Sequence, residues 1–530
     1  MTARATPVVR TVGAPQPGAG AARKPKVTLV RGPIVFASRS LNNEATPSVA
    51  FAYLSAYLMA RGYQVTWVDA IARGLNGVWE LADIPGYSCQ GLTFDEILSA
   101  IPGDSDVVGF SAMFSGEWPV MRHLIKAVRA RLPSALIVAG GEHITALTGF
   151  SLRDCPEIDV CVRGEGEHTL YEVCEAWAER RPWADIDGIA FMDRGAYVQT
   201  EGLPRIRDID NIPWPHWPEG YLEAFWTAGK SYGVSTERDM PMMVSRGCPF
   251  RCSFCSNVNM WTTRYVLREA DDVIAEIKHH IDRYGITAVQ LYDLTAITKK
   301  KWAVEFCTKL LDQGINLKWS LPSGTRSEAL DEETLTLLRD TGCNYLVFAP
   351  ESGSARTLER IRKQISLEKI TESALTAKRL GLVLRTNLII GFPGETRGDI
   401  ARTVLYGFRL AVGGVDEVTI NIFSPYPGTE LFQELLDQGR VTLSDDYFLR
   451  LTSLNSDYTA VNPLTVNETM SARELAFYRL AFMLTNYAIG YLLHPTRIWR
   501  TLRNLFSDHH SSTVLEHRLK DAMRRKKQDL

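Results

Sequence analysis

The amino-acid sequence predicts an α/β protein with two successive α/β domains and a helical region behind them. Three observations support this fold class. Short apolar runs alternate with segments of helical spacing roughly every 25 residues, which is typical of βαβ units and a parallel sheet. Small residues gather where the expected strands end. The chain has 530 residues, of which 45% are apolar, so it is long enough for roughly two to four domains.

Composition and charge argue against several classes of protein. The formal net charge is −2, so no overall basic field indicates a nucleic-acid partner. Nine cysteines in so long a chain do not indicate a disulfide framework. No apolar run reaches the roughly 18 residues of a membrane span, so we expect no membrane partner. Residues 1–25 are rich in Ala, Pro and Gly, and we expect a disordered tail there and not a signal peptide.

We expect the first domain over residues 26–183. Its predicted strands cover residues 27–30, 64–69, 106–110, 135–139 and 158–162, and its predicted helices cover residues 47–61, 94–101 and 117–132. Small residues follow these strands, namely Ser111, Gly140, Gly141, Gly164 and Gly166. In open α/β sheets a ligand binds at the carboxyl ends of the strands, and glycine lets it approach the backbone. Tight turns explain such glycines equally well, and the missing Gly-x-Gly-x-x-Gly fingerprint argues against NAD.

Residues 184–240 are expected to form a linker. The run Pro213-Trp214-Pro215-His216-Trp217-Pro218 disfavours helix and interior strand, so we expect an extended connector. Its aromatic side chains are expected to pack between domains, although lining a substrate cavity is an alternative. His216 is interpreted as a packed or solvated histidine and not as a ligand.

We expect the second domain over residues 241–440. Its predicted strands cover residues 242–246, 288–292, 317–321, 345–349, 384–390 and 418–423. Its predicted helices cover residues 269–284, 298–313, 331–341, 367–380 and 396–412. Six strands with helices between them are fewer than the eight of a closed barrel, and barrel chemistry takes place at the carboxyl ends of the strands.

The first of these strand ends carries Cys248, Cys252 and Cys255 at Cys-x3-Cys-x2-Cys spacing. Three thiolates on one short loop are close enough to ligate one compact iron–sulfur cluster. A cubane cluster normally has four cysteine ligands, so three leave one iron open for chemistry. The alternative, a zinc site, would need a fourth ligand, and no His or Cys follows at short spacing.

The other strand ends carry polar and glycine-rich segments. They are Asp293, then Ser323 and Arg326, then Pro350-Glu351-Ser352-Gly353, then Gly391-Phe392-Pro393-Gly394-Glu395, and finally 424–430. Each alone could be a turn or a cap. All of them in register with a cysteine loop are hard to explain as turns. Residues 441–530 contain an apolar segment over 478–493 and a basic end over 524–527, and we expect a small helical domain that closes the open side of the barrel and shapes a substrate pocket.

The cysteine loop, with Phe254 before its third cysteine, resembles the cluster loop of radical S-adenosylmethionine (SAM) enzymes. The resemblance implies a partial (βα)6 barrel and a [4Fe–4S] cluster held by Cys248, Cys252 and Cys255, whose open iron binds SAM. It further implies that Glu351, with Ser352 beside it, binds the ribose of SAM. Phe254 and the segment from Gly391 to Glu395 would lie at its adenine. The role of Asp293 stays open, because it departs from the glycine-rich motif of some members.

The first domain resembles the cobalamin-binding domain of the cobalamin-dependent branch of this family. The resemblance rests on Gly140-Gly141-Glu142, on the segment 162–167, and on the position of the domain before the cysteine loop. It implies that cobalamin binds at Ser111, Gly140, Gly141, Gly164, Glu165 and Gly166. No Asp-x-His-x-x-Gly motif occurs, which implies cobalamin without a histidine ligand from the protein.

The implied activity is methylation of an unactivated carbon of a small molecule through a 5′-deoxyadenosyl radical and methylcobalamin. The implied substrate is a secondary metabolite. The implied partner is an external one-electron reductant of the flavodoxin or ferredoxin type, in a reducing, cytoplasmic compartment. An oxidative cyclase or another radical rearrangement enzyme is equally compatible with the residues. A methylthiotransferase is disfavoured by the spacing of Cys155, Cys161 and Cys174, and a non-catalytic cobalamin sensor is disfavoured by the intact cysteine loop.

Overall fold

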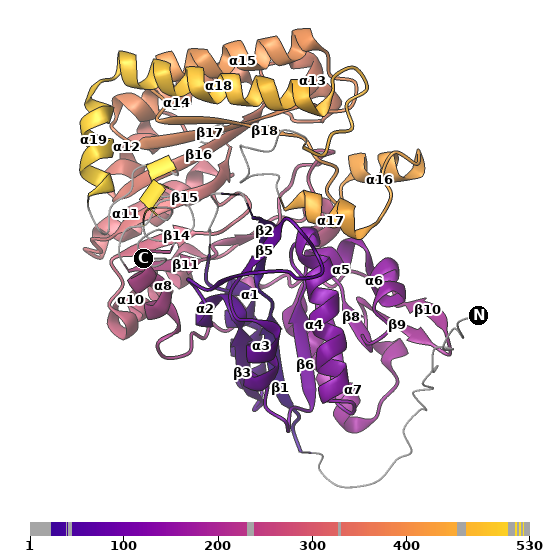
Figure 1. Cartoon of the computed structure of the whole chain (residues 1–530). Helices are drawn as coiled ribbons and strands as arrows, with labels where there is room; N and C mark the ends of the chain where they lie inside the picture. The colour runs from indigo at the N-terminus through magenta and orange to yellow at the C-terminus, as the bar shows by residue number, and fades with distance from the viewer. Residues whose placement is uncertain are drawn as a thin grey trace.

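The computed structural model describes residues 23–38, 40, 45–230, 238–326, 330–452 and 463–506, and single positions between 513 and 523. Most of the expected tail over 1–25 and the basic end over 524–527 lie outside the described residues. Figure 1 shows two α/β domains, one built from the first part of the chain and the other from the second. No described helix is both long enough and apolar enough to cross a membrane.

The first domain is built on a seven-stranded sheet. Its strands, in spatial order, are β10 (Ala196–Gln199), β9 (Ile189–Asp193), β8 (Val160–Val162), β7 (Leu136–Gly140), β6 (Val107–Ser111), β1 (Lys26–Arg31) and β3 (Gln64–Asp69). The five strands from β8 to β3 are parallel, as the sequence predicts, whereas β9 and β10 are antiparallel.

Helices cover both faces of this sheet because successive side chains of a strand point to opposite faces. Val27 and Leu29 of β1 belong to the core that holds α1 (Val49–Met59) and α7 (Gly166–Glu179). Val30 and the neighbouring strand β6 belong to the core that holds α3 (Phe94–Ala100) and α4 (Trp118–Arg131). The remaining elements of this domain are α2 (Ala70–Arg73), α5 (Glu142–Ala146), α6 (Thr148–Asp154) and a small sheet of β2 (Ile34–Ala37), β4 (Val78–Glu80) and β5 (Tyr87–Gln90).

The expected linker contains regular structure that the sequence analysis missed. β9 and β10 form a hairpin that extends the first sheet, and its turn residues Arg194 and Gly195 both have positive φ, as tight hairpin turns require. Helix α8 (Tyr221–Ala228) follows the proline run. The proline run itself, 213–218, has neither helix nor strand, as expected. Trp217 is buried and packs against Trp67 of the first domain.

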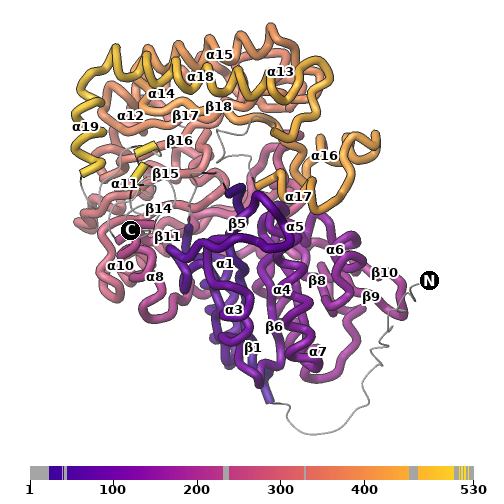
Figure 2. The backbone as a smooth tube through the Cα atoms, viewed as in Figure 1, coloured from indigo at the N-terminus to yellow at the C-terminus, as the bar shows by residue number. Residues whose placement is uncertain are grey.

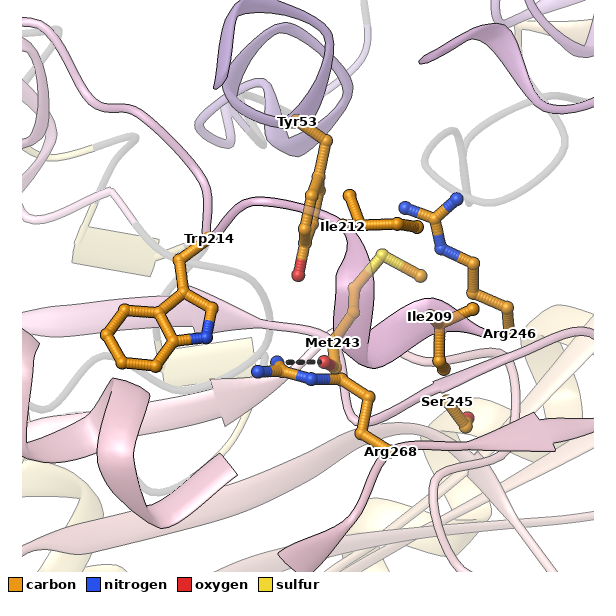
Figure 3. A pocket seen from close by; sticks show the side chains of 8 residues that line it. All are labelled: Tyr53, Ile209, Ile212, Trp214, Met243, Ser245, Arg246 and Arg268. Atoms are coloured by element: carbon orange, nitrogen blue, oxygen red, sulfur yellow. Dashed lines mark hydrogen bonds between the residues drawn. The ribbon is translucent and has the colours of Figure 1, made fainter. Parts of the chain in front are cut away.

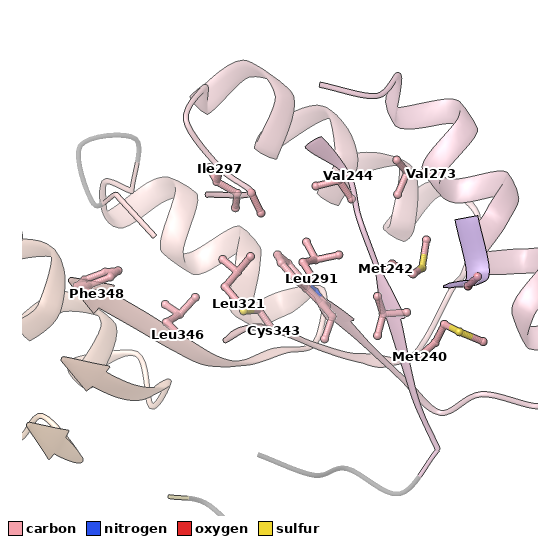
Figure 4. Packing of buried hydrophobic residues seen from close by; sticks show 14 of the residues in the cluster. Met240, Met242, Val244, Val273, Leu291, Ile297, Leu321, Cys343, Leu346 and Phe348 are labelled. Carbon is pink, nitrogen blue, oxygen red and sulfur yellow. The ribbon is translucent and has the colours of Figure 1, made fainter. Parts of the chain in front are cut away.

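The second domain is an open barrel of six parallel strands, which confirms the predicted fold class. The strands follow one another in the order of the sequence: β11 (Asp239–Met242), β14 (Ala288–Leu291), β15 (Lys318–Thr325), β16 (Cys343–Glu351), β17 (Val383–Ile390) and β18 (Glu417–Ile422). The helices between them are α10 (Ala270–Tyr284), α11 (Lys300–Asp312), α12 (Glu332–Asp340), α13 (Ala355–Arg360), α14 (Leu367–Arg379) and α15 (Arg397–Val412). Figure 4 shows Met240, Leu291 and Leu346 of three strands packed in the core beneath these helices.

The first barrel strand differs from the prediction of one strand over 242–246. β11 ends at Met242, and the next residues form β12 (Ser245–Arg246), which pairs with β13 (Val266–Leu267) outside the barrel. The buried carboxylate of Asp293 at the end of β14 accepts hydrogen bonds from the backbone N–H of Val244, at 3.0 Å, and of Ser245. The chain therefore leaves the barrel sheet before it reaches the cysteines.

The described part of the C-terminal region is helical, and its helices pack against both α/β domains. It contains α16 (Glu430–Asp437), α17 (Asp445–Leu451), α18 (Ala472–Leu493) and α19 (Thr496–Leu505). α17 packs against α4 of the first domain, whereas α18 packs against β18 and α15 of the barrel. Figure 2 shows the same arrangement, with α17 beside the first domain and α18 along the outside of the second. The C-terminal region therefore joins the two domains.

Candidate functional site

The cysteine loop lies between β12 and α9 (Asn257–Trp261), and three hydrogen bonds hold its backbone in place. The N–H of Ser253 donates to the carbonyl of Ile361 at 3.0 Å, and its own carbonyl accepts from the N–H of Leu431 at 3.0 Å. The side-chain amide of Asn257 donates to the carbonyl of Cys248 at 3.1 Å. These contacts fix the loop over the carboxyl ends of the strands, where barrel chemistry occurs.

The three cysteines of this loop differ from the other six of the chain. Cys248, Cys252 and Cys255 are partly exposed, whereas the remaining cysteines are buried. Burial raises the pKa of all three thiols, and that of Cys255 to about 12. Among the described residues, no group of three His, Cys, Asp or Glu side chains already stands in metal-binding geometry. The loop therefore fits a cluster by its donor set and accessibility, and the bound iron would hold the sulfurs as thiolates.

Glu351, at the end of β16, lies beside the cysteine loop. Its carboxylate pairs with Nζ of Lys363 at 3.0 Å, and both groups are close enough to Cys252 to shift the pKa of that thiol. Burial raises the pKa of Glu351, while Lys363 opposes this shift. Glu351 has a φ of 67°, a conformation that residues other than glycine rarely adopt and that is concentrated at functional sites.

The Gly391–Glu395 segment also meets the cysteine loop, through aromatic side chains. The ring of Phe254 packs edge-on against Phe392 with the centroids 5.8 Å apart. The Glu395 carboxylate is engaged by its own turn, whereas a cofactor-binding carboxylate would point into the site. Its carboxylate accepts hydrogen bonds from the N–H groups of Gly391 at 2.6 Å and Phe392 at 3.2 Å, and burial raises its pKa to about 7. Glu395 therefore closes the turn that presents Gly391.

Ser352 is likewise engaged within the protein. Its hydroxyl lies 2.8 Å from the Thr403 hydroxyl on α15 and accepts a hydrogen bond from the N–H of Ser354 at 3.1 Å. The side chain is fully buried. Of the pair Glu351 and Ser352, only Glu351 has a charged group beside the cysteine loop, because the strand turns at Glu351 and directs the next side chain toward the helix.

Four polar atoms around the cysteine loop are buried without a hydrogen-bond partner in the described part of the chain. They are the hydroxyls of Ser253 and Ser424, Oδ1 of Asn257 and Nδ2 of Asn259. Unsatisfied buried polar atoms cost free energy and are uncommon in native proteins, so a cluster of them indicates room for a polar ligand. Hydroxyl and amide groups of this kind can donate to and accept from a polar ligand.

The carboxyl ends of the first sheet form a second edge. β6 ends at Ser111 and β7 at Gly140, and these two residues are paired in the register of the sheet. Both are partly exposed. A Cβ atom added to Gly140 would have no neighbour closer than 3.7 Å, so this position is open. Ser111 and Gly140 are thus the predicted residues of this edge that leave space for a ligand.

The other predicted glycines of this edge are required by the protein itself. Gly141 has a φ of 111°, and a Cβ there would meet the carbonyl oxygen of Ala112 at 2.6 Å. At Gly164 a Cβ would meet Leu203 at 2.8 Å, and at Gly166 it would meet Leu54 at 3.1 Å. Contacts within the protein therefore already explain the glycine at these three positions, and their contact with cobalamin stays a prediction.

Glu165, predicted to bind cobalamin, lies instead between the two domains. Its carboxylate accepts a hydrogen bond from the N–H of Ile206 and lies 3.4 Å from Nη1 of Arg246. Arg246 also pairs with Glu167 at 2.5 Å, and its buried side chain stands two residues before Cys248. A small pocket behind this pair is lined by Tyr53 and Ser245 (Figure 3). A buried guanidinium needs counter-charges, and this need explains the position of Glu165.

The two edges face each other. α5, which follows β7, packs against α9, which follows the cysteine loop. Glu142 of α5 is hydrogen-bonded to the side chain of Ser256 and raises the pKa of Cys255. The hydroxyl of Tyr426, beyond β18, accepts a hydrogen bond from the N–H of Ser115 at 3.0 Å. Side chains from the strand ends of both sheets therefore meet at one boundary.

Sequence reasoning missed four residues of this boundary. Lys363, Glu142, Arg246 and Tyr426 contact the site through pairing partners that are distant in the sequence. Glu142 and Tyr426 stand in strand-end segments that the sequence analysis singled out, but nothing in the sequence near them shows which residues they contact, and Lys363 lies in no such segment. Asp293, whose role was open, is a buried anchor of the segment that leads to the cysteines.

Comparisons with known proteins agree with this geometry. The model of the radical SAM superfamily matches residues 242–406, and that of the B12 binding domain matches residues 43–174. An uncharacterized methyltransferase of Pyrococcus horikoshii is 27% identical over 91% of this chain and 95% of its own length. The anaerobic magnesium-protoporphyrin IX monomethyl ester cyclase of Cereibacter sphaeroides is 29% identical over 73% of this chain and 60% of its own length.

A solved structure shares the whole architecture. The radical SAM methyltransferase TsrM of Kitasatospora setae, solved with cobalamin and a [4Fe–4S] cluster bound, has a TM-score of 0.65. The match covers 96% of this chain and all of that chain at 15% sequence identity. At this identity the likeness shows the fold.

Proposed function

Because this chain belongs to the cobalamin-dependent radical SAM enzymes, on the methyltransferase side of that family, we propose that it methylates an unactivated carbon of a small molecule. The cofactors of the family are a [4Fe–4S] cluster, SAM and cobalamin. The match to a methyltransferase extends over nearly the whole length of both proteins, whereas the match to the cyclase leaves 40% of the cyclase uncovered. The nearly full-length match to a methyltransferase is the reason that methylation is proposed first and cyclisation second.

The proposal assigns the two edges to different cofactors. Cys248, Cys252 and Cys255 would hold the cluster, and Glu351 would accept hydrogen bonds from the ribose hydroxyls of SAM. Ser111 and Gly140 would border cobalamin. When bound, these groups supply a carbon radical and a transferable methyl group, and the protein supplies their relative position and the exclusion of water.

The observation that carries the proposal is the boundary where the two edges meet. Methyl transfer needs the group that removes hydrogen and the methyl donor both within reach of the same substrate carbon. The packing of α5 against α9 and the hydrogen bond from Ser115 to Tyr426 bring the strand ends of both sheets to one space. A substrate in this space would touch both cofactors. We further propose an external one-electron reductant of the flavodoxin or ferredoxin type.

The test is anaerobic reconstitution with cobalamin, reductant and SAM that carries a deuterated methyl group. Candidate small molecules, secondary metabolites first, are screened by mass spectrometry. The proposal predicts a product that contains the labelled methyl group and appears together with 5′-deoxyadenosine. A product that has lost hydrogen and gained no label would establish the cyclase or oxidase alternative instead.

A further inference from the structure

Helix α18 is apolar on all sides although it forms the outer layer of the second domain (Figure 1). Its inner side packs closely on α15, where a Cβ added to Gly407 would meet the ring of Phe482 at 2.6 Å. Its outer side repeats apolar residues at positions 477, 480, 484, 488 and 492, which is the spacing of one helical face. A helix that is apolar all round is normally buried, so this face indicates a missing neighbour.

The neighbouring helices extend this apolar face. On α15, Leu405 is 65% exposed, and on α19, which packs against the end of α18, Trp499 is 77% exposed. On α18 itself, Leu484 is 65% exposed. We define the outer apolar surface by Leu405, Phe477, Leu480, Leu484, Leu492 and Trp499. Single exposed apolar residues are ordinary, but a row of them along one helical face indicates an interaction site.

The exposed charged residues of α15, α18 and α19 are all basic. Arg402, Arg409, Arg473 and Arg503 are exposed, and no exposed residue of α15, α18 or α19 is acidic. The two acidic residues that these helices contain are engaged in ion pairs, Asp399 with Arg356 and Glu474 with Arg397. Every charged residue that these three helices expose is therefore an arginine.

We propose that the outer apolar surface attaches the protein to the surface of a membrane that contains anionic lipids. Leu, Phe and Trp side chains would enter the boundary between head groups and acyl chains, and the arginines would pair with lipid phosphates. A second copy of the chain is the weaker candidate, because self-association would place arginines against arginines. No helix in the described ranges has the length and apolarity to span a membrane, but a helix that lies in the interface needs neither.

The experiment is co-sedimentation of the full-length reconstituted protein with vesicles of phosphatidylcholine, with and without phosphatidylglycerol. The wild type is expected to bind the anionic vesicles and to dissociate as salt rises. The triple variant Arg402→Gln/Arg409→Gln/Arg473→Gln is expected to bind the anionic vesicles about 100-fold more weakly. Each basic residue near an anionic membrane surface contributes a similar share of the binding free energy. Leu480→Ser/Leu484→Ser is expected to lose at least about tenfold. Leu311→Ser, at a 51% exposed leucine of α11, is the matched control and should bind like the wild type.

Two outcomes would overturn the proposal. One is wild-type protein that stays in the supernatant with anionic vesicles at low salt. The other is light scattering that shows a dimer which Leu480→Ser/Leu484→Ser converts to a monomer, since a second copy would then cover this surface. The substituted side chains are exposed, so equal melting temperatures of all variants will show that the fold is retained. The methylation assay is independent of this result.

Discussion

The strand ends of the first sheet and those of the second face the same space, yet they present different chemistry to it. At the first edge, the two open residues Ser111 and Gly140 offer a hydroxyl and backbone. At the second, three thiols stand beside the buried pair of Glu351 and Lys363. Open backbone fits a ligand that is held largely by shape, whereas thiols and buried charges fit ligands that are coordinated or held by polar groups. The difference between the two edges is therefore one of ligand type.

The largest expected effect tests the second edge. Replacement of Cys248, Cys252 or Cys255 by Ala should abolish SAM cleavage and the iron–sulfur absorbance, because each removes one of three thiolates that no neighbouring residue replaces. Ultraviolet–visible spectra and 5′-deoxyadenosine assays of the reconstituted variants measure this. Cys307→Ala, at a buried cysteine of α11, is the control that should keep the cluster. A triple-Ala variant that still binds iron and makes 5′-deoxyadenosine would refute the assignment.

The next effect tests the joint between the two edges. Arg246→Met should destabilise the protein by about 3–5 kcal/mol, because it leaves Glu167 buried without its counter-charge and leaves Glu165 with Arg205 alone. Chemical denaturation of the apoprotein measures this loss. The double variant Arg246→Met/Glu167→Gln should recover part of it, since one of the unpaired charges is removed as well. Strictly additive losses would mean that the pair does not couple the domains.

A smaller effect tests Glu351 alone. Glu351→Gln should weaken SAM binding roughly 10- to 150-fold, which corresponds to about 1.5–3 kcal/mol for a lost hydrogen bond to a charged group. Isothermal titration of SAM into the reconstituted variant measures the change, and the cluster should remain intact. The pairing with Lys363 offers the competing explanation. An unchanged dissociation constant with a lower melting temperature would make Glu351 a structural partner of Lys363.

The smallest effect tests the first edge with two adjacent glycines. Gly140→Val adds a side chain where the protein leaves space, so cobalamin affinity should fall about tenfold with little change in melting temperature. Gly141→Ala places a Cβ against the Ala112 carbonyl in a left-handed conformation, so stability should fall instead. Cobalamin titration and thermal unfolding of both variants give the comparison. Equal cobalamin affinity for Gly140→Val and the wild type would remove Gly140 from the site.

The sequence predicts the fold well where periodicity is strong. All six barrel strands and the helices from α10 to α15 that it anticipated exist, because each is punctuated by a turn glycine or a cap such as Asp331. The sequence predicts the fold less well where a strand pairs with one that is distant in the chain. The β9–β10 hairpin was assigned to a linker, since nothing in the sequence near it shows that β9 pairs antiparallel with β8.

The residues of the candidate site also differ in how well the sequence predicts them. The cysteine loop is readable because its spacing alone carries the chemistry. The sequence does not indicate why Gly141 and Gly164 are glycine, because a glycine required by Ala112 or Leu203 looks identical in sequence to one required by a ligand. It does not indicate the partners of Glu165 and Glu395 either, because a carboxylate does not reveal whether its partner is a cofactor, Arg246 or its own backbone.

The central claim, that the two edges hold their cofactors in one shared space, is tested most directly by electron paramagnetic resonance of the full-length reconstituted protein. The reduced cluster and cob(II)alamin are both paramagnetic. The account predicts that cluster reduction broadens the cob(II)alamin signal or speeds its relaxation, and that this effect disappears in Cys255→Ala. Signals of the two centres that are superimposed without any mutual influence would contradict the account.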